Sequence, residues 1–578
     1  MENTLNNSTI SEIQRICLDI DGGRSAENTQ SCEDQGQLLV AASTEKELHC
    51  TFALVDLFPG QLLVIEDVFL WVPTAQHSFL ICHHCKGRVS IGEPTLKCEE
   101  CGIPIYCSER CQHDAQTLHA LECHLVAHVP HALRDKKSLS GSQLGLLLKV
   151  RAKRKLLQNL STENNQYKTE VDALSVFQKL VFEEELFSTV WKEECELAIQ
   201  SLTEWDTHQI LGNTKDCTSD LFRIKAHLHE VEVPFSQDSK VLITAVFPRL
   251  SCFQHSCSPN CYYWTNNGKM EVRSIQQVRS GVPLSVSYTA IYAPRFQRRS
   301  SLLESNHIFC NCTRCQTWES EEIIDGFVCD GCEKHIIKGE VGNDLDTTTS
   351  IRANNELAVP SDETKQTQEH KKNEGTADAL CGISIEDTEG NNEELCEYVP
   401  CPFCGFENNY SDVLATKKEL ETYSQFDQGV LLLLQNPFVQ DQVNDILEIS
   451  ESILHPHNYL IFRSRQVLYQ ACLDSGNIEG CIQHCKKIIK CLSCSVMPKY
   501  SVEAASYLMI LGFLFLKLAG YCSQGHDGYS QEQRNGYINQ AYQAFKDAKL
   551  HQDICTGEGS VIQKLEQINK RIDNIQPP

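Results

Sequence analysis

Paired cysteine and histidine side chains between residues 82 and 123 carry the strongest chemical signal in the sequence. The pairs are Cys82 with Cys85, Cys98 with Cys101, Cys107 with Cys111, and His119 with Cys123. Thiolate and imidazole are the ligands that zinc prefers in structural sites, which are tetrahedral. This ligand set predicts two zinc sites. In so short a stretch, zinc binding and folding would be one event, because thiolate ligation requires deprotonated sulfur.

Two Cys-x-x-Cys pairs further along the chain, Cys329 with Cys332 and Cys401 with Cys404, are typical of a zinc ribbon. Between them, residues 338–398 hold 15 acidic and 5 basic side chains, a net charge of -10. Such a composition cannot bury enough apolar surface to fold, so we expect a disordered acidic loop. Cys381 and Cys396 lie in that loop, where we expect free thiols. The two Cys-x-x-Cys pairs predict one zinc site that joins the two ends of this loop.

A polar turn, residues 254–260 with the letters QHSCSPN, is followed by a regular series of short elements. Residues 262–264 and 270–275 read as two strands joined by a hairpin. A Gly-Val-Pro turn then leads into the alternating run from Leu284 to Tyr288, and Cys310, Cys312 and Cys315 follow. Each part has an ordinary interpretation, since polar turns are common, a tyrosine on an apolar strand is usually a core residue, and clustered cysteines can be free thiols.

The order of these parts resembles the C-terminal half of a SET domain, the fold of protein-lysine methyltransferases, followed by a cysteine-rich post-SET segment. The resemblance implies that later chain threads the polar turn in a pseudoknot beside an S-adenosylmethionine pocket. Tyr288 would be the catalytic tyrosine at the lysine channel. Cys257 would join Cys310, Cys312 and Cys315 in one zinc site. The residues expected to contact the cofactor are Gln254, His255, Ser256, Cys257 and Asn260.

Several positions depart from the SET pattern. A Gly-x-Gly that lets backbone approach the cofactor closely is replaced by Leu48-His49-Cys50. Gln254 stands where the family has Asn, Ala290 where an acidic residue is common, and Asn306 where an aromatic residue lines the channel. These departures keep a second interpretation open, in which the chain is a catalytically inactive, zinc-binding SET-fold adaptor in protein–protein interaction or transcriptional regulation.

The first cysteine-rich segment, with Ile105-Tyr106-Cys107-Ser108, resembles a MYND zinc finger. MYND fingers interleave their ligands, which implies one ion held by Cys82, Cys85, Cys107 and Cys111, and another held by Cys98, Cys101, His119 and Cys123. Members of this class bind proline-rich peptides, but most have Trp where this chain has Gln116. The finger could therefore bind such a peptide or only brace its neighbours.

A MYND finger between two SET halves resembles the SET and MYND domain (SMYD) family, and we favour its arthropod, Msta-like branch. The expected fold class is α+β: a β-rich SET fold with an inserted MYND zinc finger, a zinc-binding post-SET segment and an all-α tetratricopeptide-like C-terminal domain. We expect a disordered tail over 1–36, the first SET part over 37–75, the finger over 76–130, a helical linker over 131–240, the SET core over 241–292, the post-SET segment with the first ribbon knuckle over 293–337, the acidic loop over 338–398, the second knuckle over 399–410 and the helical C-terminal domain over 411–578.

Periodic apolar residues predict the helices of the last domain. They are expected over 466–473, 480–492, 501–518 and 537–550, the third ended by Gly520. A run of apolar strand character is expected over 61–72. The basic cluster Lys149 to Lys155 is expected to be a solvated helix face.

Composition limits the partners and the compartment. The chain has 578 residues and a formal net charge of -26, which argues against binding nucleic acid through a broad basic surface. The start of the chain lacks the apolar core of a signal peptide. The apolar run Met509 to Ala519 is interrupted by Lys517 and is too short to span a bilayer. We therefore expect a cytoplasmic or nuclear S-adenosylmethionine-dependent protein-lysine methyltransferase that uses zinc structurally, acts on histone or non-histone proteins and does not engage membranes.

Overall fold

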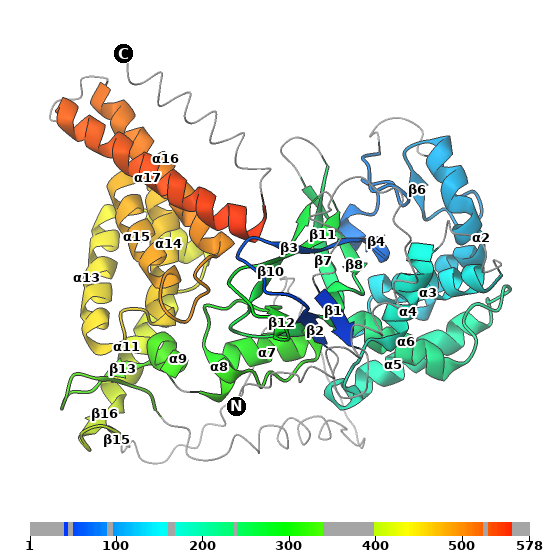
Figure 1. Cartoon of the computed structure of the whole chain (residues 1–578), viewed down its shortest axis with the longest axis horizontal. Coiled ribbons are helices and arrows are strands. Elements are labelled where there is room, and N and C mark those ends of the chain that lie inside the picture. Colours follow the sequence, from blue (N-terminus) through cyan, green and yellow to red (C-terminus); the bar gives the residue numbers. More distant parts are fainter. Residues whose placement is uncertain are drawn as a thin grey trace, which may run out of the picture.

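A computed structural model describes residues 40–43, 50–89, 96–159, 168–235, 240–266, 268–317, 319–338, 398–523 and 530–557. The predicted tail, the acidic loop with Cys381 and Cys396, and Leu48 with His49 lie outside the described residues. Figure 1 shows three regions side by side: the finger with its helical insert on the right, short strands in the middle, and the C-terminal helices on the left.

Three small sheets form the middle region. Their strand orders are β1-β2-β12-β9, β10-β11-β3 and β4-β8-β7. Each sheet joins chain from before the finger to chain from after it, because β2 pairs with β12, β3 with β11 and β4 with β8. The finger is therefore inserted into one split domain. The bounds are β1 Val40–Ser43, β2 Cys50–Ala53, β3 Leu62–Asp67, β4 Leu70–Pro73, β7 Leu228–Pro234, β8 Lys240–Val246, β9 Gln254–His255, β10 Cys261–Asn266, β11 Lys269–Ser274 and β12 Pro283–Val286.

The chain crosses itself where β9 lies parallel to β12. Ser285 pairs with Gln254 and Val286 with His255. The amide of Asn260 locks this crossing, because its Nδ2 donates to the carbonyl O of Pro283 at 2.8 Å and its Oδ1 accepts from the backbone N–H of Ser285 at 2.8 Å. The predicted threading of the polar turn is present.

The predicted run of strand character over 61–72 forms two strands. β3 pairs with β11 and β4 pairs with β8, so the chain leaves one sheet and enters another between Asp67 and Leu70. The predicted hairpin between residues 262 and 275 is confirmed, with Asn266 opposite Lys269 at its turn.

The finger and four helices pack as one unit beside the sheets. A two-stranded sheet, β5 Leu96–Lys97 and β6 Ile105–Tyr106, precedes the long helix α2 Glu109–Ala132. The helices α3 Gly141–Asn159, α4 Lys168–Lys179, α5 Thr189–Thr203 and α6 Thr214–Ala226 follow, with the 3-10 turn η3 Glu184–Leu186 between α4 and α5, while the 3-10 turn η1 Ala75–His77 precedes the finger. Leu144, Phe177 and Trp191 belong to the large apolar core that α2 to α6 share.

The basic cluster on α3 is partly buried, so the prediction of a solvated helix face is wrong. Arg151 is 5% exposed and its guanidinium lies 3.1 Å from the carboxylate of Asp220 on α6. Arg154 contacts the same carboxylate at 3.0 Å. A buried charge is tolerated when it is paired, and the acidic partner lies 66 residues away in sequence, out of reach of local pattern analysis.

The chain after the sheets forms α7 Arg295–Asn306, α8 Thr313–Gln316, α9 Glu319–Asp325 and two hairpins, β13 Phe327–Val328 with β14 His335–Ile336 and β15 Tyr398–Pro400 with β16 Glu407–Asn409. The C-terminal helices are α11 Tyr410–Tyr423, α12 Gln428–Leu434, α13 Pro437–Ile453, α14 Tyr459–Ser475, α15 Ile478–Leu492, α16 Val502–Ser523 and α17 Gln531–Cys555. The predicted break between α14 and α15 is present, with Gly476 at a left-handed φ of 76°.

Helix α16 does not end at Gly520 but continues to Ser523. Its residues Val502–Gly520 are long and apolar enough to cross a membrane by length and composition. The apolar segment is therefore longer than the predicted run from Met509 to Ala519. A core helix of a globular domain passes the same test. Leu511, Phe515 and Ala519 of α16 are buried in the core that it shares with α15 and α17.

Candidate functional site

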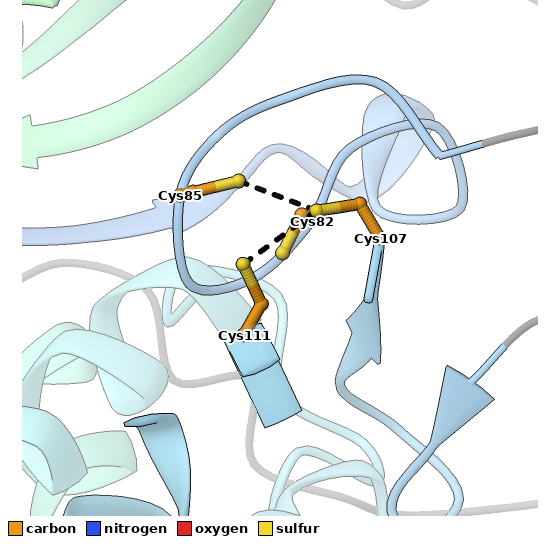
Figure 2. A group of neighbouring side chains, drawn as sticks. All are labelled: Cys82, Cys85, Cys107 and Cys111. Atoms are coloured by element: carbon orange, nitrogen blue, oxygen red, sulfur yellow. Dashed lines mark hydrogen bonds between the residues drawn. The ribbon is translucent and has the colours of Figure 1, made fainter. Parts of the chain in front are cut away.

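The first finger quartet comes from two turns and the start of α2. Figure 2 shows the sulfur atoms of Cys82, Cys85, Cys107 and Cys111 converging on one point. The Sγ atoms of Cys85 and Cys107 are 3.5 Å apart, and those of Cys107 and Cys111 are 3.6 Å apart. The N–H of Gly87 donates to Cys85 Sγ at 3.3 Å, which favours a thiolate there.

The second finger quartet joins Cys98, Cys101, His119 and Cys123. His119 Nε2 is 3.4 Å from Cys101 Sγ, and its Nδ1 is 3.6 Å from the carboxylate of Glu122. Lys149 on α3 contacts that carboxylate at 3.5 Å. A carboxylate behind a ligating histidine fixes the ring and its tautomer. Because Lys149 belongs to the helical insert, this contact ties the finger to the rest of the fold.

The third quartet brings Cys257 of the crossed turn to Cys310, Cys312 and Cys315. Cys257 Sγ lies 3.6 Å from Cys315 Sγ and 3.9 Å from Cys310 Sγ. The fully buried Arg298 donates to Cys315 Sγ at 3.5 Å and pairs with Glu321 at 2.9 Å. Arg314 donates to the carbonyl O of Cys257 at 3.0 Å, which holds the turn against α8.

The fourth quartet is the ribbon. Cys329 Sγ lies 3.7 Å from Cys404 Sγ, and Cys332 Sγ lies 3.7 Å from Cys401 Sγ. The N–H of Gly331 donates to Cys329 Sγ at 3.3 Å. The two knuckles therefore meet across the long intervening loop, as predicted.

All four quartets fit zinc. Tetrahedral zinc with bonds of about 2.3 Å to sulfur separates its ligands by about 3.8 Å, close to the measured separations. In each quartet all ligand atoms lie within 4.8 Å of one another, in the sets expected from the sequence. No disulfide joins two cysteines in the described part of the chain. The thiolate-rich donor sets and their spacing make zinc the structural metal of this protein.

A cavity of about 690 Å³ lies between the crossed turn, the post-SET segment and the end of α4. This volume suits a nucleoside-sized ligand. Three chain segments, residues 179–183, 251–256 and 306–313, line it together with Tyr288. Phe182, Ile308 and Phe309 make part of the lining apolar, as in most small-molecule sites.

Tyr288 places its hydroxyl against the backbone of the crossed turn. The hydroxyl oxygen lies 2.9 Å from the carbonyl O of Phe253 and 3.2 Å from that of Leu250. Burial raises the pKa of Tyr288 well above its usual value, so the phenol stays protonated. Its proton is directed at these carbonyls, which leaves the oxygen lone pairs as acceptors. The rings of Tyr263 and His229 each lie 5.9 Å from the Tyr288 ring.

His255 connects the cavity to the third zinc quartet. The backbone N–H of Tyr288 donates to its Nδ1 at 3.1 Å. Nδ1 is therefore an acceptor, and the neutral ring carries its proton on Nε2, which lies 3.3 Å from Cys257 Sγ. Burial lowers the pKa of His255 to about 4, which favours the neutral ring. His255 of the crossed turn therefore contacts both the cavity and the third zinc quartet.

The predicted cofactor residues do not all face the cavity. Gln254, His255 and Ser256 line it. Cys257 belongs to the zinc quartet, and the Asn260 amide is used by the strand crossing. Asn306 lines the cavity where the family has an aromatic residue. Of the residues that replace the Gly-x-Gly, only the backbone of Cys50 is described, at the start of β2.

Sequence reasoning missed two cavity histidines, His229 and His307. His307 stacks on Phe187 with ring centroids 3.9 Å apart, and its Nδ1 lies 3.3 Å from the carbonyl O of Leu186, to which it donates. Its Nε2 is buried without a partner, so it offers a lone pair to a ligand donor. Burial and the nearby Lys225 lower the pKa of His307 to about 4, and burial lowers that of His229 to about 4. No sequence motif marks either residue.

A sheet domain that is split by an inserted zinc finger and threaded by its own polar turn is the arrangement of a SET domain with a MYND finger. Family models agree: the SET domain model matches residues 107–289 and the MYND finger model matches residues 82–123.

Proteins similar to this chain are named as lysine methyltransferases. The chain is 27% identical over 274 residues to histone-lysine N-methyltransferase SMYD3 of Mus musculus, covering 46% of this chain and 59% of that protein. It is 21% identical over 306 residues to histone-lysine N-methyltransferase ASHR1 of Arabidopsis thaliana, covering 51% and 60%. With N-lysine methyltransferase SMYD2 of Homo sapiens it shares 22% identity over 264 residues, covering 46% and 57%.

The chain carries a SET domain and a MYND finger, the two domains that give the SET and MYND domain (SMYD) family its name. It spans about three fifths of the length of these relatives. The arthropod, Msta-like branch stays a prediction. A solved SET domain, that of LSMT bound to lysine and AdoHcy, gives a TM-score of 0.28 at 11% identity over 99% of this chain and 94% of that chain, too distant a likeness to support an argument.

Proposed function

We propose that this protein is an S-adenosylmethionine-dependent protein-lysine N-methyltransferase. The observation that carries the proposal is that Tyr288, which lines a nucleoside-sized cavity, directs its hydroxyl proton at the carbonyls of Phe253 and Leu250. An oxygen held in this way accepts from a lysine amine and stabilises the positive charge that develops on it during transfer. S-adenosylmethionine, when bound, supplies the electrophilic methyl group.

The residues of the cavity suit this chemistry. His255 and Ser256 would hold the cofactor with Gln254, all three being lining residues. The unpartnered His307 Nε2 would accept from a donor group of the cofactor. With their low pKa values, His229 and His307 are uncharged near neutral pH, so they do not repel a cationic sulfonium. Burial in such a cavity also favours the neutral form of the attacking lysine amine.

Two measurements test the proposal. Calorimetry with S-adenosylhomocysteine should show binding, and absence of binding at millimolar ligand would support the inactive adaptor instead. Radiolabelled methyl transfer to cell extract should fall by at least about 100-fold in Tyr288→Phe, since a preorganised oxyanion-type contact is worth that much. Tyr262→Phe is the matched control, because Tyr262 lies on β10 and does not line the cavity.

Finer aspects of the proposal concern partners and compartment. A protein substrate, histone or non-histone, follows from the proposed activity, and a proline-rich peptide at the MYND finger is a further candidate partner. The acidic net charge of -26 makes nucleic acid an unfavourable partner. We place the protein in the cytoplasm or nucleus, since thiolate-rich zinc sites need a reducing compartment.

A further inference from the structure

Near the end of strand β3, an apolar side chain is exposed and the charged side chain next to it is buried. Ile65 is 40% exposed, whereas its neighbour Glu66 is 7% exposed. A carboxylate is rarely buried unless it is paired or hydrogen-bonded. Both oxygens of Glu66 accept from backbone N–H groups, that of Arg249 at 2.8 Å and that of Leu250 at 2.9 Å. The buried Glu66 carboxylate therefore has a specific partner, the backbone at Arg249, which lies 183 residues further along the chain.

The two N–H groups begin the 3-10 turn η4 Leu250–Cys252. Within the turn, the N–H of Cys252 donates to the carbonyl O of Arg249 at 3.2 Å and that of Phe253 to the carbonyl O of Leu250 at 2.9 Å. The first N–H groups of such a turn have no partner inside it. The Glu66 carboxylate satisfies them and fixes where the turn starts.

The same turn supplies the acceptors of the Tyr288 hydroxyl. Leu250 is bound on one side through its N–H to Glu66 and on the other through its carbonyl O to Tyr288. The Leu250 side chain is fully buried in the core of the sheets. A shift of the turn would therefore move both carbonyls away from the hydroxyl.

We propose that Glu66 is a positioning residue for Tyr288, acting through the backbone of the turn from Arg249 to Phe253. This inference rests on the proposed function for its effect on methyl transfer, but the structural coupling can be measured without activity. Glu66 does not line the cavity, so it is not a catalytic residue.

The coupling is sensitive to pH. Burial raises the pKa of Glu66 to about 7, opposed by the N–H groups of Arg249 and Leu250 and by the Arg249 charge, and assisted by Asp67. Tyr288, a further titratable group near Glu66 among the described residues, stays protonated, and Met270 lies opposite Glu66 on β11. The ionised carboxylate accepts both N–H bonds, whereas the protonated acid directs an O–H group toward one of them. The hydrogen bonds between Glu66 and the turn therefore change as the pH falls through about 7.

Fluorine NMR of the full chain with 3-fluorotyrosine incorporated at position 288 tests the coupling directly. Between pH 5.5 and 9 the resonance should shift with a midpoint near 7, and Glu66→Gln should abolish that transition. Asp67→Asn is the control, because the Asp67 side chain is 75% exposed and pairs with Lys269, and it should retain the transition. A flat wild-type titration, or a transition that persists in Glu66→Gln, overturns the proposal. If Glu66→Gln does not fold, Glu66→Asp should titrate with a displaced midpoint, and an unchanged midpoint overturns the proposal.

Activity gives a second measure. At pH 8, Glu66→Gln should bind S-adenosylhomocysteine within about twofold of the wild type, while kcat for methyl transfer falls about tenfold, the effect of one lost hydrogen bond. Equal losses in binding and kcat would indicate a general structural role and overturn positioning. If the wild type binds no S-adenosylhomocysteine, the proposed function fails, and the fluorine titration still decides the role of Glu66.

Discussion

The zinc finger and the tyrosine cavity each depend on one buried glutamate, and the two differ in what surrounds the carboxylate. Glu122 is 3% exposed and contacts Lys149 and His119. Glu66 is 7% exposed and contacts backbone N–H groups. Burial alone would raise the pKa of each carboxyl group. In Glu122 the contacts with Lys149 and His119 outweigh burial, so its pKa is lowered, whereas burial raises the pKa of Glu66 to about 7. Similar burial therefore gives a permanent charge in one region and a titrating one in the other.

Removing the permanent charge should have the largest effect. Glu122→Ala leaves Lys149 without its carboxylate and His119 without the group that orients it. We expect a loss of about 3 kcal/mol in the free energy of unfolding and zinc affinity reduced by about 10-fold or more. Thermal unfolding and zinc transfer to a chromophoric chelator measure the two effects.

The matched control for that change is Asp114→Ala on the same helix. Asp114 pairs with Arg110 at 3.6 Å, with side chains 44% and 90% exposed. Exposed pairs of this kind contribute less than about 1 kcal/mol. Equal effects of the two substitutions would show that the contact with Lys149 and His119 adds nothing to zinc retention.

The titrating glutamate, Glu66, should make the folded protein less stable as the pH rises. Because the pKa of folded Glu66 is about 7 and its ordinary value is 4.5, the folded state binds the extra proton between those values. Its contribution to stability is present below about 4.5 and is lost as the pH rises through 7, by about 3 kcal/mol in all. Urea unfolding at pH 5 and pH 8 should show this loss in the wild type, and Glu66→Gln should not show it. An identical pH dependence in both would contradict the comparison.

The cavity histidines should give a smaller effect in acid. The pKa of His307 is about 4 when folded, against an ordinary value of 6.5, so its contribution is present above 6.5 and lost as the pH falls through 4. His307→Gln should reduce the acid sensitivity of unfolding by about 2 kcal/mol, allowing for solvent screening. Unfolding followed between pH 4 and 7 tests this, with His113→Gln on exposed surface of the finger as control.

Local spacing in the sequence predicts which ligands pair, and the family resemblance supplies how the pairs combine into the finger and post-SET quartets. Ligands such as Cys82 and Cys85 are neighbours along the chain, so one turn places them both. The crossed turn and Tyr288 were also recognised from their order, since short strands join them.

Long-range partners could not be predicted in this way. Arg151 was assigned to solvent because its partner Asp220 lies on another helix. Glu66 and His307 belong to no motif, and their roles depend on Arg249 and on a cavity assembled from three segments. The pattern of apolar residues also does not show that residues 61–72 change sheets, because the strands' partners, β11 for β3 and β8 for β4, lie far along the chain.

The split of the sheets on either side of the finger has a consequence for synthesis on the ribosome. The N–H of Ser280 donates to Asp56 across 224 residues of intervening chain. At 5–20 residues per second, the early strands wait about 10 to 45 s for their partners. The finger completes its own ligand set during that interval, so a zinc-loaded module should already be present when the later strands emerge and close the domain.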